Sequence, residues 1–364
     1  MNKINIAILG YGTVGKALFN ILSKTKEVNI KYVFDFEFKR SELKELLQTD
    51  YNVIIEDESI GIVFEAMGGD KLPYTIVKKC LENGMNVISS NKEMVSKHIY
   101  ELTKIAEKNN VSFLYEAAVG GGIPLIKPLM EIRKFDNIES FLGILNGTTN
   151  FVLTKISEGM EFNQALKFAQ EKGYAEKDPT SDLDGTDLKR KGIILSTLCF
   201  NKVIKYDSIL SFGIKFFPKE LPAYLEEHKL ILKMGIMAKN IEDKIYLYIG
   251  PMIVKNDSIL SKIKNENNAF FINSKLNGPL SFIGKGAGGD PTASAMMQDL
   301  FTILDGGISN NIKNKEMEFS SLSEPYLALD SNELVIKNIS NLNDLKEYPF
   351  VARILVQGEV NEEI

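Results

Sequence analysis

Cysteine and histidine are scarce in this chain, and each shortage excludes a class of protein. Its two cysteines, Cys80 and Cys199, are too few for a secreted disulfide framework and lack C-x-x-C spacing. Its two histidines cannot build a usual zinc site. We therefore expect a protein of the reducing cytoplasm.

Long apolar runs and blocks of like charge are also missing. No uninterrupted run of about 18 apolar residues occurs, and residues 1–9 carry one basic residue, a short apolar run and no cleavage site. The 43 basic and 48 acidic side chains leave a net charge of −5 without a basic arm. Membranes, DNA and RNA are therefore not expected as partners.

The length and composition are those of a globular protein. At roughly 150 residues per domain, 364 residues predict two domains. The first part of the chain alternates short apolar strands with helices. The predicted strands are residues 4–9, 30–34, 62–67, 87–90 and 111–115, and the predicted helices are residues 16–23, 74–83 and 97–108. This alternation predicts an α/β fold with a doubly wound parallel sheet of the Rossmann type.

After the glycine run 120–122 the pattern becomes mixed, and we place a domain boundary near residue 125. Helices are predicted at 162–172, 187–200 and 219–233, and a strand at 244–249. These elements predict a second, α+β domain over residues 126–289. A second glycine cluster, 284–289, leads through Pro291 into another apolar helix.

A G-x-G-x-x-G motif, Gly10, Gly12 and Gly15, follows the first predicted strand and opens a helix. There the glycines permit a tight turn, close approach of the backbone to a pyrophosphate, and close helix packing. The phosphate would lie at the positive end of the helix. A P-loop fits in part, but Ala17 stands where it needs a hydroxyl for magnesium. The motif therefore favours a dinucleotide cofactor.

The choice between NAD and NADP depends on the end of the second strand. Asp35 lies about twenty residues after Gly15, where a carboxylate binds the ribose 2′-hydroxyl of NAD. Lys39 and Arg40 follow and could serve a 2′-phosphate, or form a solvated charged turn, so the choice stays open. Further cofactor contacts are expected from the same turn and from the ends of neighbouring strands, at Thr13, Val14, Met67 and Ser90.

Five carboxylates precede the predicted helix 187–200: Glu176, Asp178, Asp182, Asp184 and Asp187. Capping of a helix N-terminus accounts for one or two of them. A calcium loop is excluded, because Lys191 stands where its bidentate Glu belongs. Asp187 and Lys191 are four residues apart and share a helix face. On the surface, the two would form a minor salt bridge. In a cleft, Lys191 could instead protonate a developing alkoxide.

Two further segments carry polar groups with two readings each. Asn91-Lys92 ends a strand at the carboxyl edge of the sheet, where ligands bind, but Asn91 could also be a helix cap. Glu116 and the glycine run after it offer a carboxylate and carbonyls suited to a small cation. A sharp turn between domains explains those glycines nearly as well.

Six motifs in order resemble homoserine dehydrogenase, over residues 4 to about 303. They are Asn91-Lys92, EAAVGGGIP at 116–124, GILNGTTN at 143–150, GYAE-x-DP at 173–179, DL-x-G-x-D-x-x-x-K at 182–191 and G-x-GAGG at 284–289. The resemblance implies reversible reduction of L-aspartate 4-semialdehyde to L-homoserine with NADPH or NADH, on the route to threonine, methionine and isoleucine. A nucleotide-sensing protein without chemistry is the rival, and retention of the lysines and carboxylates of these motifs speaks against it.

By resemblance, Lys191 is the proton donor and Asp187 its partner in orienting substrate. Glu176 holds the substrate amino group, and Asp182 lines the same pocket. Lys92 lies close to nicotinamide and substrate. The resemblance also places Gly173 and Gly286 beside the cofactor, and a structural sodium-type site at Glu116 and the carbonyls of Val119, Gly121 and Ile123.

The family is generally dimeric, with a sheet of the second domain shared between subunits. The resemblance implies that a helix around 290–312 returns to the nucleotide-binding domain of residues 1–125, leaving 313–364 as a short C-terminal extension. Two features depart from the family. Phe34 and Asp35 stand where many members carry an arginine, so a preference for NADP is open. After Asp299 no ACT pattern is recognisable, so threonine feedback through such a domain is not expected.

Overall fold

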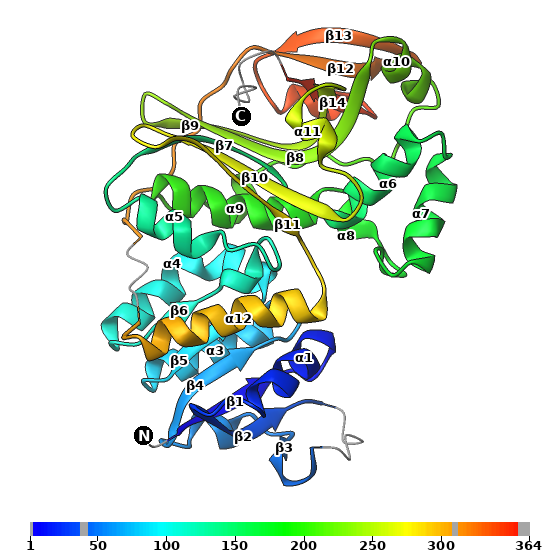
Figure 1. Ribbon diagram of the computed structural model, residues 1–364. Helices are drawn as coiled ribbons and strands as arrows, with labels where there is room; N and C mark the ends of the chain where they lie inside the picture. Colours follow the sequence, from blue (N-terminus) through cyan, green and yellow to red (C-terminus); the bar gives the residue numbers. More distant parts are fainter. Residues whose placement is uncertain (1–2, 37–42, 308–311, 356–364) are drawn as a thin grey trace. The chain divides into compact units, whose positions relative to one another are not determined.

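The computed structural model describes residues 3–36, 43–307 and 312–355. The chain forms two compact units, each described here by itself. The first unit comprises Met1–Met130 and Ala287–Asn314, and the second comprises Glu131–Gly286 and Lys315–Ile364. Each unit contains its own β-sheet (Figure 1). Within the described ranges, no helix has both the length and the apolar character needed to cross a membrane.

The first unit is built on a six-stranded sheet in the order β3-β2-β1-β4-β5-β6. Its strands are β1 (Ile4–Leu9), β2 (Val28–Phe34), β3 (Leu47–Gln48), β4 (Ile60–Glu65), β5 (Asn86–Ser89) and β6 (Phe113–Leu114). Every pair is parallel, and β1 lies between β2 and β4. The predicted doubly wound parallel sheet is therefore confirmed. Because the strands are parallel, the residues that follow β1, β2, β4 and β5 meet at one edge.

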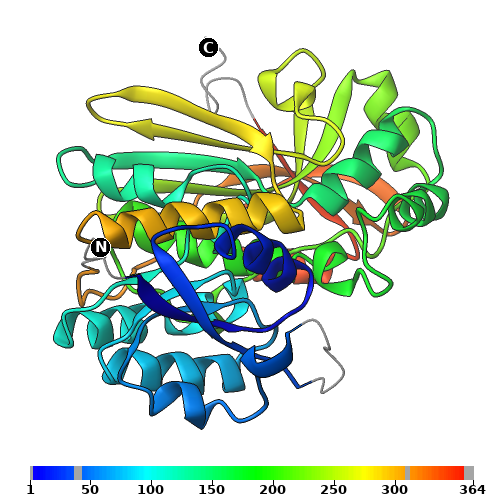
Figure 2. The ribbon, with the colours of Figure 1, turned by 60° about the horizontal axis from the view of Figure 1, so that its bottom comes forward.

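The helices of the first unit alternate with these strands. They are α1 (Thr13–Leu22), η1 (Lys44–Leu46), α2 (Asn52–Ile55), α3 (Lys71–Glu82), α4 (Lys92–Lys108), η2 (Glu116–Ala118) and α12 (Gly289–Leu304). The helix α5 (Ile126–Ile132) spans the division between the units. Although α12 comes late in the sequence, it lies beside α1 (Figure 2). Its buried Met296 and Leu300 join the cluster that contains Ile6, Ile8 and Leu18, so α12 completes the core of this unit.

The second unit contains an eight-stranded sheet in the order β11-β10-β7-β8-β9-β14-β12-β13. Its strands are β7 (Ile138–Ile144), β8 (Leu230–Ile241), β9 (Lys244–Lys255), β10 (Asn267–Ser274), β11 (Gly278–Lys285), β12 (Glu324–Asp330), β13 (Glu333–Ile339) and β14 (Val351–Ile354). The pairing is antiparallel except between β14 and β9. The C-terminal strands belong to this core, because the buried hydroxyls of Tyr246 and Tyr326 lie 2.9 Å apart.

Helices of the second unit carry most of the residues predicted to bind substrate. They are α6 (Gly147–Ser157), α7 (Phe162–Glu171), α8 (Thr180–Leu183), α9 (Thr186–Phe200), η3 (Tyr206–Ser208), α10 (Leu221–Glu227), α11 (Ile259–Lys262) and η4 (Asp344–Glu347).

The predicted helix 219–233 is wrong in its second half. The helix α10 ends at Glu227, Lys229 adopts a left-handed backbone with φ of 55°, and Leu230 begins β8. Because β8 pairs with both β7 and β9, cross-strand bonding outweighs the helical spacing of its apolar residues.

Candidate active site

The glycine loop between β1 and α1 has the geometry that the motif predicts. Gly10 has φ of 94°, and a Cβ there would lie 2.7 Å from the Ala66 carbonyl oxygen. A Cβ at Gly15 would lie 2.0 Å from the Gly10 oxygen, so α1 packs closely on the loop. Around Gly12 no atom lies within 4 Å of such a Cβ. This open position, as the N-cap of α1 with no side-chain cap, suits close approach of a pyrophosphate.

Asp35 follows β2 and lies next to this loop. Its Oδ2 accepts the backbone N–H of Tyr11, between the first two glycines, at 2.9 Å. The loop therefore holds the carboxylate beside the dinucleotide motif, as the ribose hypothesis requires. Thr13 and Val14 lie in the first turn of α1. Lys39 and Arg40 lie outside the described residues.

The ends of β4 and β5 are organised around a buried carboxyl group that the sequence analysis did not single out. Glu65 accepts hydrogen bonds from the Met67 N–H at 2.8 Å and from the Ser89 hydroxyl. Its exposed fraction is 0%, and burial raises its pKa to about 7 although these hydrogen bonds oppose the shift. The Ser90 N–H also donates to the Glu65 carbonyl oxygen.

The cap reading of Asn91 is confirmed. Its Oδ1 accepts the N–H groups of Glu93 and Met94, both at 3.1 Å, at the start of α4. Its Nδ2 donates to the Gly69 carbonyl oxygen. Lys92 is the first residue of α4 and half-buried, so the cap holds its backbone at the carboxyl edge of the sheet.

Glu116 is buried and binds the first turn of α5. Its Oε1 accepts the N–H groups of Leu125 at 2.5 Å and Ile126 at 2.8 Å, and its Oε2 accepts that of Lys127 at 2.7 Å. Asp299 of α12 accepts the Glu116 N–H at 2.9 Å. Burial raises the pKa of both carboxyls, and the charge of Glu116 raises that of Asp299 further.

These contacts bear on the predicted cation site. Within residues 3–36, 43–307 and 312–355, no group of three or more His, Cys, Asp or Glu could hold a metal. A site with one carboxylate and three carbonyls needs no such group. Gly120 and Gly121 both have positive φ, which lets the backbone turn sharply after Glu116. Both carboxylate oxygens of Glu116 already accept N–H groups at the start of α5.

In the second unit, Lys191 lies within a buried polar cluster. Its Nζ is 2.7 Å from Asp187 Oδ2 on the same face of α9, and it donates to the Leu145 carbonyl oxygen at 2.5 Å. The exposed fractions of Asp187 and Lys191 are 3% and 7%. The surface salt-bridge alternative is therefore wrong, because both charges are withdrawn from bulk water.

Asn146 joins the carboxylates of this cluster. Its Nδ2 donates to Asp182 Oδ1 at 2.6 Å and to Asp187 Oδ2 at 2.8 Å. Its Oδ1 accepts the Thr149 N–H and so caps α6. Asn146 belongs to the GILNGTTN motif, whose resemblance assigns it no role. An Asn directly before a helix start is a typical cap, but the start of α6 was not predicted, and sequence spacing does not show that Asn146 also bonds Asp182 and Asp187.

The five carboxylates of residues 176–187 fall into three groups that differ in their surroundings. Asp178 and Asp184 accept the N–H groups of Thr180 and Thr186, which are the first residues of α8 and α9. Asp182 and Asp187 belong to the lysine cluster. Glu176 lies on the loop before α8, and its side chain is exposed.

The two glycines predicted beside the cofactor have different surroundings. Gly173 has φ of 77° in the turn after α7, with open space where a Cβ would lie. At Gly286 a Cβ would lie 2.0 Å from the side-chain amide of Asn268. Packing against Asn268 therefore explains the glycine at 286 without a cofactor.

Comparison with known proteins identifies the family. The model described as "Homoserine dehydrogenase, NAD binding domain" matches residues 10–116, and that described as "Homoserine dehydrogenase" matches residues 124–301. The homoserine dehydrogenase of Lactococcus lactis subsp. lactis is 35% identical over 89% of this chain and 80% of its own. That of Helicobacter pylori is 35% identical over 83% and 74%.

A solved structure agrees with these relatives. The crystal structure of a homoserine dehydrogenase from Thiobacillus denitrificans superposes with a TM-score of 0.86 at 25% identity, covering 98% of this chain and 99% of that one. The chain therefore belongs to the homoserine dehydrogenase family and is an oxidoreductase with a nicotinamide-nucleotide-binding domain.

Proposed function

We propose that Lys191 is the proton donor in the reversible reduction of L-aspartate 4-semialdehyde to L-homoserine. The observation that carries this proposal is the buried position of Lys191 between Asp187 and the Leu145 carbonyl. Asp187 favours the charged ammonium, and the carbonyl fixes the direction of Nζ. A bound reduced nicotinamide supplies the hydride. The lysine then delivers a proton to the aldehyde oxygen, and takes it back in the oxidation of homoserine.

The carboxylates around this lysine suit the ammonium group of the substrate. Asp182 and Asp187 share the amide of Asn146, which orients one oxygen of each. We assign Asp182 to the same pocket, Asp187 to orientation of the substrate and Glu176 to its amino group. Glu176 is exposed on its loop, so it is available to an incoming cation.

On the nucleotide side, we propose that the cofactor is bound through Gly10, Gly12, Gly15, Thr13 and Val14, with further contacts at Met67, Ser90, Lys92, Gly173 and Gly286. The contact of Asp35 with the Tyr11 amide favours NAD, because a carboxylate there binds the ribose 2′-hydroxyl and repels a 2′-phosphate.

Three further properties extend the proposal. A sodium-type cation at Glu116 and the carbonyls of Val119, Gly121 and Ile123 would offset the two buried carboxyls beside it. The cation would have a structural role. A homodimer is proposed because the family is generally dimeric, and a cytoplasmic location is proposed because the chain has few cysteines.

The test is nicotinamide absorbance with L-homoserine, run separately with NAD and NADP, for the natural chain and for Asp35→Asn. We expect turnover with a higher kcat/KM for NAD, and a preference that shifts towards NADP in the variant by about tenfold. Asp50→Asn, which changes another carboxylate of the same unit, should leave the ratio unchanged. Binding of nucleotide without turnover would favour the sensing protein instead.

A further inference from the structure

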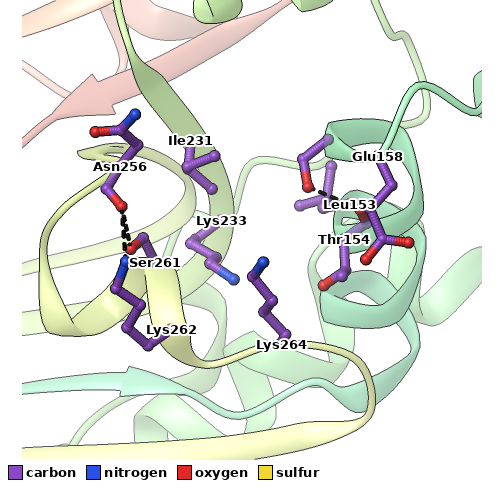
Figure 3. A pocket seen from close by; sticks show the side chains of 10 residues that line it. Leu153, Thr154, Glu158, Ile231, Lys233, Asn256, Ser261, Lys262 and Lys264 are labelled. Atoms are coloured by element: carbon purple, nitrogen blue, oxygen red, sulfur yellow. Dashed lines mark hydrogen bonds between the residues drawn. The ribbon is translucent and has the colours of Figure 1, made fainter.

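A second cluster of lysines lines a pocket of about 200 Å³ in the second unit, and nothing described so far uses it (Figure 3). The pocket lies between α6, β8 and the connection from β9 to β10 that contains α11. Its lining residues are Leu153, Thr154, Ser157, Glu158, Ile231, Lys233, Asn256, Ser261, Lys262 and Lys264. Three of them are lysines and one is acidic.

Lys233 is the buried member of this cluster, with an exposed fraction of 3%. Its Nζ donates to Asn150 Oδ1 at 2.9 Å and to the Ile263 carbonyl oxygen. Figure 3 shows the Nζ groups of Lys233 and Lys264 pointing toward one another within the pocket. Burial and the charge of Lys264 together lower the pKa of Lys233 to about 8.

Among the described residues that line the pocket, one acidic side chain stands against three lysines. Glu158, the one acidic lining residue, lies 2.8 Å from Lys155. Two like charges that face one another in a partly enclosed pocket repel, and the repulsion disappears when an anion lies between them.

The remaining polar groups restrict the kind of anion. The hydroxyls of Thr154, Ser157 and Ser261 donate to backbone carbonyls, so the donors that remain among the lining side chains are the ammonium groups and the amide of Asn256. Lysines bind phosphate as point charges, whereas recognition of carboxylate or phosphate by a planar fork requires arginine. A doubly charged tetrahedral anion can pair with two ammonium groups at once. The pocket also has room for such an anion, because its volume of about 200 Å³ exceeds that of several water molecules at about 30 Å³ each.

A larger pocket, lined by both apolar and polar side chains, adjoins this one. It has a volume of about 570 Å³ and shares Leu153, Ser157, Glu158, Ile231 and Asn256 with the lysine pocket. Phe217, Pro222 and Leu225 line it further away. An organic group attached to a phosphate in the lysine pocket would therefore have apolar surface to bind.

We propose that the pocket between Lys233 and Lys264 binds a phosphate dianion, either as inorganic phosphate or as a monoester with a small apolar group. The site is separate from the residues assigned to homoserine and nucleotide, and it does not depend on their roles.

The test is calorimetric titration with inorganic phosphate and with phenyl phosphate, at constant ionic strength and with saturating NAD to occupy the glycine loop. We expect saturable binding, about tenfold weaker in Lys264→Ala and abolished in Lys264→Glu, whose carboxylate would take the place of the anion. Lys244→Ala, which removes an exposed lysine of β9 outside the pocket, should bind like the natural chain. Lys264 is exposed, so these variants should fold, and thermal melting checks this.

Tighter binding of phenyl phosphate than of phosphate would identify a monoester, and equal binding would identify the free ion. Phosphate should raise the melting temperature of the natural chain but not of Lys264→Glu. Equal affinity in the natural chain, Lys264→Ala and Lys264→Glu, or no saturable binding, would overturn the proposal.

Discussion

Lys191 and Asp187 lie one helical turn apart on α9 with their charged atoms 2.7 Å apart and both side chains buried. A buried charge is costly unless its partner and hydrogen bonds are in place. Each residue therefore depends on the other for a partner of opposite charge, because burial withdraws both side chains from bulk water.

Replacement of Lys191 should stop the reaction without weakening the binding of the nucleotide. We expect Lys191→Met to lower kcat with homoserine by at least about 100-fold, since it removes the proton donor. The dissociation constant of NAD, followed by fluorescence, should change by less than about twofold. Lys189→Met, on the same helix but over the Tyr206 ring, is the control and should keep its rate. A Lys191→Met protein with most of its activity would refute the assignment.

Loss of the Asn146 amide, which Asp182 and Asp187 share, should lower kcat/KM for the substrate more than it lowers the stability of the fold. Asn146→Ala removes both the cap of α6 and the donor of Asp182 and Asp187, and we expect kcat/KM for homoserine to fall by at least about tenfold. Glu161→Ala removes the comparable cap of α7 and should cost about 1 kcal/mol of stability with kcat/KM unchanged. If both variants lose activity equally, capping alone accounts for the effect.

The glycines of the nucleotide loop should separate binding from folding. In Gly12→Ala the new methyl meets no protein atom, so stability should hold while affinity for NAD falls by at least about tenfold. In Gly15→Ala the methyl collides with the Gly10 backbone and should destabilise the first unit by about 2 kcal/mol or more. Thermal melting and NAD titration of the two variants measure both effects. An unstable Gly12→Ala would show that this position is structural.

Glu65 should make stability depend on pH. Its pKa is raised from 4.5 to about 7, so the folded state keeps a proton that the unfolded state loses. The contribution of Glu65 to the free energy of unfolding therefore falls by up to about 3 kcal/mol between pH 4.5 and about 7, and does not change further above that pH. Glu65→Gln should match the natural chain at pH 5 and be more stable at pH 8, in urea unfolding. Glu58→Gln, an exposed substitution in the same unit, should show no such difference, and parallel curves for Glu65→Gln would contradict the shift.

Local rules sufficed for the nucleotide loop. A strand, the glycines and a helix follow one another within residues 4–22, so the short-range pattern predicts the turn between them. The alternation of strands with helices predicts that the strands of the sheet are parallel. The sequence does not predict the short strand β3, because Leu47 and Gln48 show no alternation of apolar and polar residues. β8 was misread because its apolar residues fit both periods until β7 and β9 are placed beside it.

The substrate cluster was only partly predictable. The spacing of Asp187 and Lys191 places them on one helix face, but burial depends on packing that no local pattern contains. The hydrogen bonds that Asp178 and Asp184 accept depend on where α8 and α9 start. Asn146 reaches Asp182 and Asp187 from about forty residues away, which spacing cannot reveal. The C-terminal strands β12 and β14 likewise gave no signal of the sheet they would join.

The late position of α12 has a consequence for synthesis. The ribosome finishes the segment Met1–Met130 long before Gly289–Leu304 emerges, and until then the apolar surface around Leu18 has no cover. The nascent amino-terminal part must wait in an open form, and a recombinant fragment ending near Met130 should aggregate unless Gly289–Leu304 is supplied as a separate peptide.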